Sequence, residues 1–255
     1  MARKKSEFLR SLGIMWQIWQ VLVSEILDQG GNDDDIRRIE TDTNLCKEIA
    51  TLIVGKKVNS DINPFVIPMS DDSLPFQMIG LAKKWRKLAT HFNYDGPVAW
   101  EVKAGFTVKK HAPQAGPCYK KFQYLQNWDF NDEPTTHAIV FWIPRLLPES
   151  TSKNVDEQKE LLAGLRKQFE LPEHHLSSLG SVALLVALIL KHYQLTGEMA
   201  PLDNLWSRTG SRRSDGDRLD LRWGEDSLDC VDNHWDECRH VSLGVFALGV
   251  EALGK

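Results

Sequence analysis

Val182–Leu190, VALLVALIL, is the longest uninterrupted apolar run in the chain. A membrane-spanning helix needs roughly 20 such residues, so this run is far too short to cross a bilayer. A helix of this composition also has no polar face to turn toward water. The run therefore predicts a helix that is buried on all sides.

Another helix is predicted just upstream of this run. Residues 161–169 carry leucine and phenylalanine at helical spacing, and Leu171-Pro172 ends the helix because proline cannot continue it. The preceding stretch, LPESTSKNVDEQ, has the composition of a linker. Ser152 or Asn154 in this linker is placed to cap the helix.

Two strands are predicted in the middle of the chain. From Val98 to Val108 apolar residues alternate with others, which is the two-residue repeat of a half-buried strand. Thr136–Pro144, THAIVFWIP, is the second strand. The Pro- and Gly-rich stretch between them, HAPQAGPCYKKF, is expected to be a loop. A catalytic pair of His111 and Cys118 there would lack a visible orienting residue.

The first ninety residues are expected to be mainly helical. Phe8–Leu27 carries a broad apolar face but no signal-peptide cleavage site, so it predicts an amphipathic helix that packs or docks. A helix lying on a membrane surface is the alternative. Thr43–Gly55 predicts a second helix. Ser73-Leu74-Pro75 begins a third, which runs to about His91. Its basic residues could hold phosphate, but a solvated face is favoured in an acidic protein.

Composition limits the classes of function. Of the 255 residues, 42% are hydrophobic and 26% charged, which is typical of a soluble globular protein. The net charge of −4 gives no overall attraction to nucleic acid, and no segment predicts a membrane span. Only four cysteines occur, which favours a reduced, cytoplasmic chain over a disulfide scaffold.

From Leu205 onward the composition and the patterning of the chain change. Charged and apolar residues alternate in Arg218–Trp223, RLDLRW, which predicts a strand that covers a core and presents its charges outward. Val241–Val250 is a second strand-like piece. No Lys lies between Lys191 and Lys255, so Arg supplies all the positive charge. Arg together with Trp, Asp and His is typical of contact surfaces, although these charges could also pair with one another.

Cys230–His240, CVDNHWDECRH, contains potential metal ligands. The pattern C-x3-H-x3-C-x-H has suitable ligand types, but its spacing differs from that of structural zinc sites. A disulfide between Cys230 and Cys238 is disfavoured in a reduced chain. The favoured interpretation is a loop whose side chains contact something outside the protein, and neither a metal nor another cofactor is predicted.

Three short motifs carry a family resemblance. Leu171-Pro172 precedes a helix, Trp206-Ser207-Arg208-Thr209 begins a strand, and Gly244-Val245 lies in the final one. Roughly residues 155–255 thereby resemble the C-type-lectin-like fold, in the branch of formylglycine-generating-enzyme-like proteins and variable proteins of diversity-generating retroelements. The enzyme's paired cysteines are more closely spaced than Cys230 and Cys238, so that activity is not implied. The tail also resembles the ends of uncharacterised bacterial proteins.

The resemblance implies a binding surface near the C-terminus. In the diversified members, variable positions gather there on a rigid fold and form the ligand-binding face. Residues 207–242 are rich in the residue types that adenine-directed changes at Asn codons produce, and they contain no Lys. The candidate ligand-binding residues are Trp206, Arg208, Arg218, Asp220, Arg222, Trp223, Asp226, Asp229, Asp232, His234, Trp235, Asp236, Arg239 and His240.

Together these patterns predict an α+β protein with a helical segment at 1–60, a mixed region with a strand pair at 61–150, and a C-type-lectin-like domain at 151–255. The first functional hypothesis is a non-enzymatic protein that binds a protein or small-molecule ligand through its tail. A metal- or thiol-dependent enzyme centred on Cys230, His234 and Cys238 is the second. A structural subunit that docks through its N-terminal helix is the third.

Overall fold

The computed structural model describes residues 63–253 except 126, 129–131, 201–204, 225 and 232–233, and, nearer the N-terminus, residues 19, 23, 24, 27, 30–32, 34, 37, 38, 41 and 42. The chain divides into two compact units, Met1–Asn59 and Ser60–Lys255. Of the predicted first helix, the described residues Trp19, Val23 and Leu27 are helical. The predicted helix at Thr43–Gly55 lies outside the described residues.

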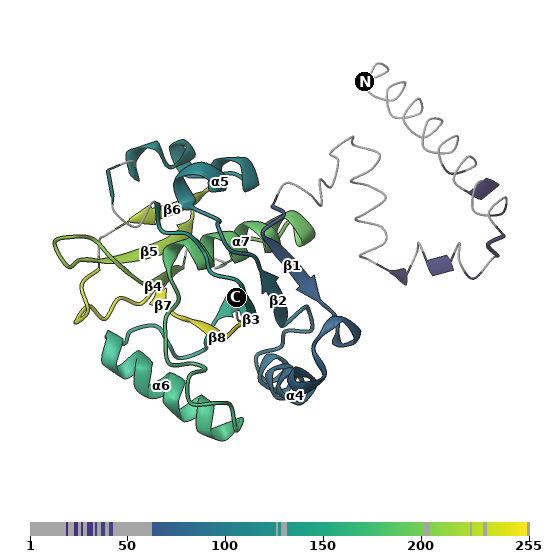
Figure 1. Cartoon of the computed structure of the whole chain (residues 1–255), viewed down its shortest axis with the longest axis horizontal. Helices are drawn as coiled ribbons and strands as arrows, with labels where there is room; N and C mark the ends of the chain where they lie inside the picture. Colours follow the sequence, from purple (N-terminus) through teal and green to yellow (C-terminus); the bar gives the residue numbers. More distant parts are fainter. Residues whose placement is uncertain are drawn as a thin grey trace, which may run out of the picture. The chain divides into compact units, whose positions relative to one another are not determined.

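The chain is an α+β protein, and the second unit contains two four-stranded sheets. The first sheet is antiparallel, with the order β1 (Val66–Met69), β2 (Ala99–Val102), β3 (Ala138–Leu146) and β8 (Phe246–Ala252) (Figure 1). In it Phe141 of β3 lies between Ala99 of β2 and Gly249 of β8. The last strand of the chain therefore pairs with a strand from its middle, and the predicted boundary at 150 falls inside this unit.

The second sheet is built from the tail. Its order is β6 (Leu228–Val231), β5 (Arg218–Trp223), β4 (Trp206–Arg212) and β7 (Leu243–Gly244), and only the β4–β7 pair is parallel. The predicted strand at Arg218–Trp223 is thus confirmed, whereas the piece predicted at Val241–Val250 is divided between β7 of this sheet and β8 of the first sheet.

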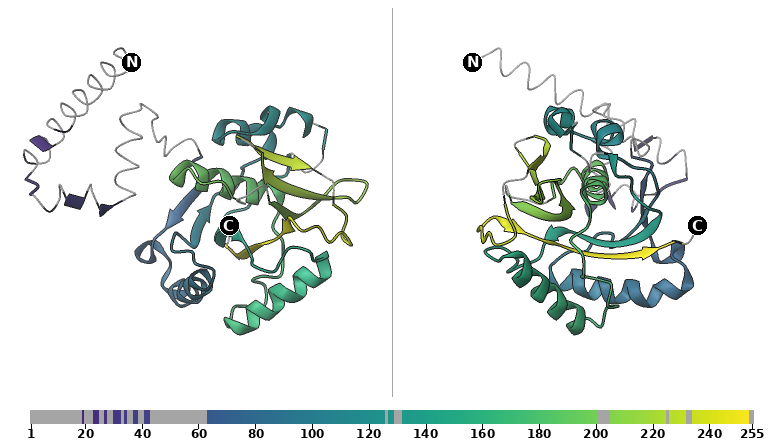
Figure 2. Two further views of the ribbon diagram at one scale, coloured as in Figure 1. Left: turned by 180° about the vertical axis from the view of Figure 1, so that it is seen from behind. Right: turned by 60° about the vertical axis from the view of Figure 1, so that its left-hand side comes forward.

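Helix α7 (Val182–Thr196) is the buried helix that the VALLVALIL run predicts, and ten of its residues are buried. The Ser181 hydroxyl caps its first turn, and Gly197 ends it with a left-handed φ of 72°. One continuous apolar cluster joins α7 to Trp142 of the first sheet and Leu221 of the second. Figure 2 shows α7 almost along its axis, above the first sheet in the right-hand view.

Two helices cover the other face of the first sheet (Figure 2). They are α4 (Phe76–His91) and α6 (Val155–Gln168), and both were predicted. Asn154 is the cap of α6: its side chain accepts from the Glu157 N–H while the Glu157 carboxylate accepts from the Asn154 N–H. Short 3-10 turns complete the unit at η1 (Asp71–Ser73) and η2 (Tyr119–Leu125).

The predicted strand at Val98–Val108 is only partly correct. Strand β2 ends at Val102, a turn with Gly105 at φ 99° follows, and helix α5 begins at Val108. Helix α5 (Val108–Ala115) takes up the first part of the predicted loop. Val108, Ala112 and Ala115 recur at helical spacing and are buried, so the apparent alternation ran from a strand into the first apolar position of a helix. None of the described helices is both long enough and apolar enough to span a bilayer.

Candidate ligand-binding surface

Most of the predicted site residues that the structure describes gather on the face of the second sheet that points away from α7. Arg208 of β4 lies opposite Asp220 of β5, and Trp206 lies opposite Arg222. The chain that follows β6 folds back across this face, and its described part, residues 234–242, is called the closing loop below. Asp232 lies outside the described residues.

Several candidates are covered by the closing loop. Asp220 and Arg208 are fully buried, and Arg218 is 6% exposed. The prediction that the β5 charges point into solvent is therefore wrong for Arg218 and Asp220. Alternation along a strand tells which residues share a face, but it does not tell what covers that face. Trp223 is buried on the opposite side, where it packs against Tyr193 of α7 and its indole N–H donates to the Ala200 carbonyl.

Arg208 holds the closing loop from beneath. Its guanidinium donates to the backbone carbonyls of Asp236 and Cys238 and to the Gln158 side chain. Burial lowers the pKa of Arg208, but guanidinium is so basic that the side chain stays charged. The negative ends of the two carbonyl dipoles compensate much of the buried positive charge of Arg208.

Asp220 forms a second contact with the loop. Its Oδ2 lies 2.8 Å from His234 Nδ1, and burial raises the pKa of this carboxyl group while the His234 contact lowers it. Asp220 Oδ1 and the Nε atoms of Arg208 and Arg222 have no hydrogen-bond partner among the described residues. Buried atoms of this kind are satisfied by ordered water in most proteins.

Three further ion pairs hold the loop at its middle and end. Asp236 accepts from Arg218 Nε at 2.7 Å and also pairs with Arg212. The bond from Arg218 is the largest cause that lowers the pKa of Asp236 to about 2, and Arg212 adds to it. Arg239 donates to both oxygens of Glu157 on α6, at 2.9 and 3.1 Å. The loop is thus fixed to β4, β5 and α6.

What remains accessible is a smaller set of side chains. Trp235 is 61% exposed and Val241 is 73% exposed, although the loop that carries them is held firmly. Arg239 and His240 are also exposed, and the His240 ring lies 5.4 Å from the His234 ring. Trp206 is almost covered, with the Arg222 guanidinium 4.3 Å above its ring.

The two acidic candidates before the loop differ. Asp226 is exposed and forms no ion pair with another described residue. Asp229 is half-buried, where it accepts from the Tyr124 hydroxyl at 2.6 Å and lies 3.8 Å from Arg222. Sequence reasoning missed Tyr124, Glu157 and Arg212 as partners of the site, because their contacts join residues far apart in the chain.

The cysteines and histidines of CVDNHWDECRH do not converge on one point. Cys230 pairs with Leu221 across the strands and belongs to the apolar cluster around α7, whereas His234 contacts Asp220 on the opposite face of the sheet. Cys118 and Cys238 are free thiols. The four potential ligands of this stretch therefore form no common metal site in the described structure.

One other group of potential metal ligands occurs among the described residues: His174, His175 and Glu251. The Trp85 indole N–H donates to His175 Nδ1 at 3.0 Å. An indole nitrogen can only donate, so Nδ1 carries the lone pair and the neutral ring has its proton on Nε2, which lies 3.0 Å from Glu251. A protonated Nε2 offers no lone pair to a metal, so His175 instead links α4 to β8 through its hydrogen bond from Trp85 and its close contact with Glu251.

The Cys118 and His111 pair also fails as a catalytic arrangement. Burial raises the pKa of Cys118 to about 12, and its thiol contacts the Ala112 carbonyl. The protonated thiol is a poor nucleophile at neutral pH. His111 Nδ1 is engaged by the Thr107 N–H at 2.9 Å.

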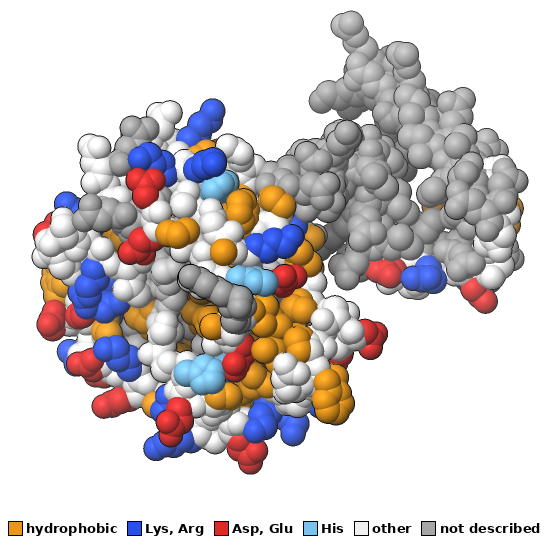
Figure 3. Space-filling model, viewed as in Figure 1, with side chains coloured by type: hydrophobic (Ala, Val, Ile, Leu, Met, Phe, Trp, Pro, Cys, Tyr) orange, Lys and Arg blue, Asp and Glu red, His pale blue; other side chains and the backbone are white. Residues whose placement is uncertain are grey.

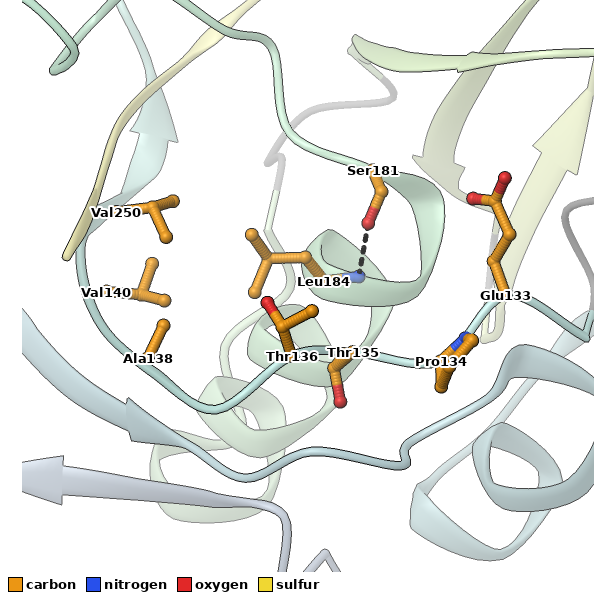
Figure 4. Close-up of a pocket in the computed structure, with 9 residues that line it drawn as sticks. All are labelled: Glu133, Pro134, Thr135, Thr136, Ala138, Val140, Ser181, Leu184 and Val250. Carbon is orange, nitrogen blue, oxygen red and sulfur yellow. Dashed lines mark hydrogen bonds between the residues drawn. The ribbon is translucent and has the colours of Figure 1, made fainter. Parts of the chain in front are cut away.

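The structure also contains a cavity of about 240 Å³ beside the start of α7 (Figure 4). Ala138, Val140, Leu184 and Val250 give it apolar walls, and the Ser181 hydroxyl at its edge is engaged by the Leu184 N–H. None of the predicted site residues lines this cavity.

The surface around the closing loop can make contacts but shows no reactive constellation among the described residues. Its histidines, carboxylates and guanidinium groups are mostly engaged in holding the loop, while Trp235, Val241 and His240 face outward. Comparison with known protein families, curated proteins and solved structures found no match.

Proposed function

We propose that this chain is a non-enzymatic binding protein that contacts a protein ligand through its closing loop. The observation that carries the proposal is Trp235, a tryptophan that is 61% exposed on a loop anchored by Arg208, Asp236 and Arg239. A side chain as large and apolar as tryptophan is mostly buried when a chain folds. A large exposed ring on a firmly held loop is typical of a binding hot spot.

The anchoring contacts favour binding because they reduce its entropic cost. Association orders side chains and loops, and that ordering weakens affinity when the free surface is mobile. Here the ion pairs of Asp236 and Arg239 order the loop before any ligand arrives. Trp235 and Val241 are then presented as apolar anchors, with Arg239 and His240 as polar neighbours.

A protein ligand fits this surface better than a small molecule. Small-molecule sites are concave and enclose most of the ligand. Trp235 and Val241 are instead exposed to more than half of their area and lie on a loop, and the cavity of about 240 Å³ is lined by other residues.

The resemblance to the C-type-lectin-like fold supports this proposal. Leu171-Pro172 precedes the buried helix α7, Trp206 begins β4, and Gly244-Val245 leads into the final strand β8, which is the order that the resemblance implies. We propose that the tail is a binding face of the kind found in diversified variable proteins, in a cytoplasmic chain. A near-copy of its coding sequence beside a reverse transcriptase gene would support diversification.

The test compares two exposed aromatic residues. The full chain is immobilised as wild type, as Trp235→Ala and as Phe76→Ala, a control because Phe76 is 89% exposed on α4. Proteins recovered from a host lysate are identified, and the dissociation constant of each purified partner is measured. A hot spot costs about 2 kcal/mol when truncated, so Trp235→Ala should weaken binding roughly 30-fold. Phe76→Ala should leave it unchanged.

Two results would contradict the proposal. One is a partner whose affinity is the same for wild type and Trp235→Ala. The other is stoichiometric zinc or copper in the purified chain that Cys230→Ser removes, which would favour the metal-dependent enzyme instead.

A further inference from the structure

A second surface, separate from the closing loop, lies on α5 and the segment that follows it. Figures 1 and 2 show these two elements side by side, and in Figure 3 Lys and Arg side chains gather over them at the top of the view. The surface, called the basic–aromatic surface below, consists of Lys110, Tyr119, Lys120, Lys121, Tyr124 and Trp128.

Its backbone has an unusual conformation. Lys120, Lys121 and Phe122 are consecutive left-handed residues, with φ of 44°, 51° and 56°. Side chains other than glycine disfavour this region, and such strain gathers at functional sites. Burial of Phe122 and Leu125 beneath the turn holds it in place. The exposed rings on either side therefore have fixed positions.

The aromatic rings form a continuous row. The Tyr119 and Tyr124 ring centroids lie 5.9 Å apart, and those of Tyr124 and Trp128 lie 6.5 Å apart. Tyr119 is 43% exposed and Tyr124 is 37% exposed. The Tyr124 hydroxyl is fixed by Asp229 and by the Cys230 backbone, which leaves its ring as the accessible part.

The lysines beside this row are not neutralised. Lys110, Lys120 and Lys121 are exposed and form no ion pair with any described residue, and Lys120 Nζ lies 5.1 Å from the Tyr119 ring. The net charge of −4 belongs to the whole chain, whereas this surface combines three exposed lysines with two exposed rings, and the Arg213 guanidinium lies 5.0 Å from the third ring, that of Trp128.

We propose that the basic–aromatic surface binds single-stranded nucleic acid. Proteins that bind single strands combine cations along the phosphate backbone with aromatic rings on which bases stack, and both are present here. An acidic peptide would use the lysines but not the rings. A lipid surface favours side chains that protrude, whereas these rings pack edge to face against one another.

Fluorescence anisotropy of a labelled oligo-dT with the full chain tests the proposal. We expect binding at low salt that weakens as salt is raised. Lys120→Glu with Lys121→Glu should reduce the affinity at least about tenfold. It should also make the slope of log affinity against log salt concentration less negative, by about 0.7 for each lost phosphate contact. Tyr119→Ala should weaken binding roughly fivefold or more, through lost stacking.

The matched control is Lys83→Glu with Lys87→Glu, which reverses two exposed lysines on α4. It should bind as wild type does, and thermal melting should show that every variant is folded. Absence of binding at low salt, equal loss in the two charge variants, or an unchanged affinity of Tyr119→Ala would overturn the proposal. Binding of poly-glutamate or of anionic phosphatidylserine vesicles as tight as that of oligo-dT would overturn it as well.

Discussion

At the scale of single residues, Asp236 connects the closing loop to the second sheet. Arg218 is 6% exposed, and Asp236 is the carboxylate that pairs with it. A buried charge that loses its partner is far more destabilising than a surface ion pair is stabilising. The loop conformation that exposes Trp235 therefore depends on this carboxylate.

Asp236→Asn tests this dependence. Because the folded-state pKa of Asp236 is about 2, below its usual 3.8, its ionised form stabilises the fold above pH 3.8, and that stabilisation is lost as the pH falls through 2. Since Asp236 is partly exposed, we expect the variant to lose only about 1–2 kcal/mol of unfolding free energy near neutral pH. The difference from wild type should shrink toward pH 2, as measured by urea unfolding across pH.

Asp226→Asn is the control for this experiment, because it removes the same charge at an exposed position with no ion pair to a described residue. Its unfolding free energy should match that of wild type within about 0.5 kcal/mol. Equal effects of the two substitutions would show that Asp236 does not hold the loop.

At the scale of elements, α7 is the core around which both sheets pack. Leu185 and Leu188 are fully buried in it, whereas Leu195 near its end is 40% exposed. Removing buried methylene groups costs their transfer free energy and leaves a cavity, while an exposed leucine has little to lose.

Leu185→Ala should therefore lower the unfolding free energy by about 2–5 kcal/mol. Leu195→Ala, the same change on the same helix, should cost less than about 1 kcal/mol. Urea unfolding followed by circular dichroism measures both. Similar losses for the two variants would contradict the buried position of α7 between the sheets.

Local patterns predicted most of these elements but not their surroundings. The cap of α6 at Asn154, the apolar run of α7 and the alternation of β5 each depend on residues close in sequence, and each was confirmed. The β2 prediction ran too far because Phe106 and Val108 continue its alternation by coincidence. For the site, most of the residues that meet at the second sheet were named, but Tyr124, Glu157 and Arg212 were missed. The burial of the named residues could not be predicted either, because another segment of the chain covers them.

At the scale of the whole molecule, the first sheet joins parts of the chain that are far apart. Strand β3 lies between β2 and β8, so residues 99–102 and 246–252 belong to one hydrogen-bonded layer. The Trp85, His175 and Glu251 contacts add a second connection, between α4 and the end of the chain. Neither part can keep its core without the other.

We expect residues 60–255 to unfold in a single cooperative transition. Hydrogen exchange of β2 and β8 amides in increasing denaturant would then report the same opening free energy. Deletion of residues 246–255 should abolish the protection of β2 as well as that of β3. Protection of β2 that survives this deletion would instead support independent folding of the middle region.

The sequence by itself determined the helices α4, α6 and α7, the strands β3 and β5 and the presence of an Arg- and Trp-rich tail, because each depends on the local spacing of apolar, polar and capping residues. Only the tertiary structure decided which of the tail's charges are exposed. The closing loop turns back over β4 and β5, where it pairs Asp236 with Arg218 and His234 with Asp220 but leaves Trp235 in solvent. Burial and pairing depend on segments that meet only in the folded chain, and a one-dimensional pattern does not contain those contacts.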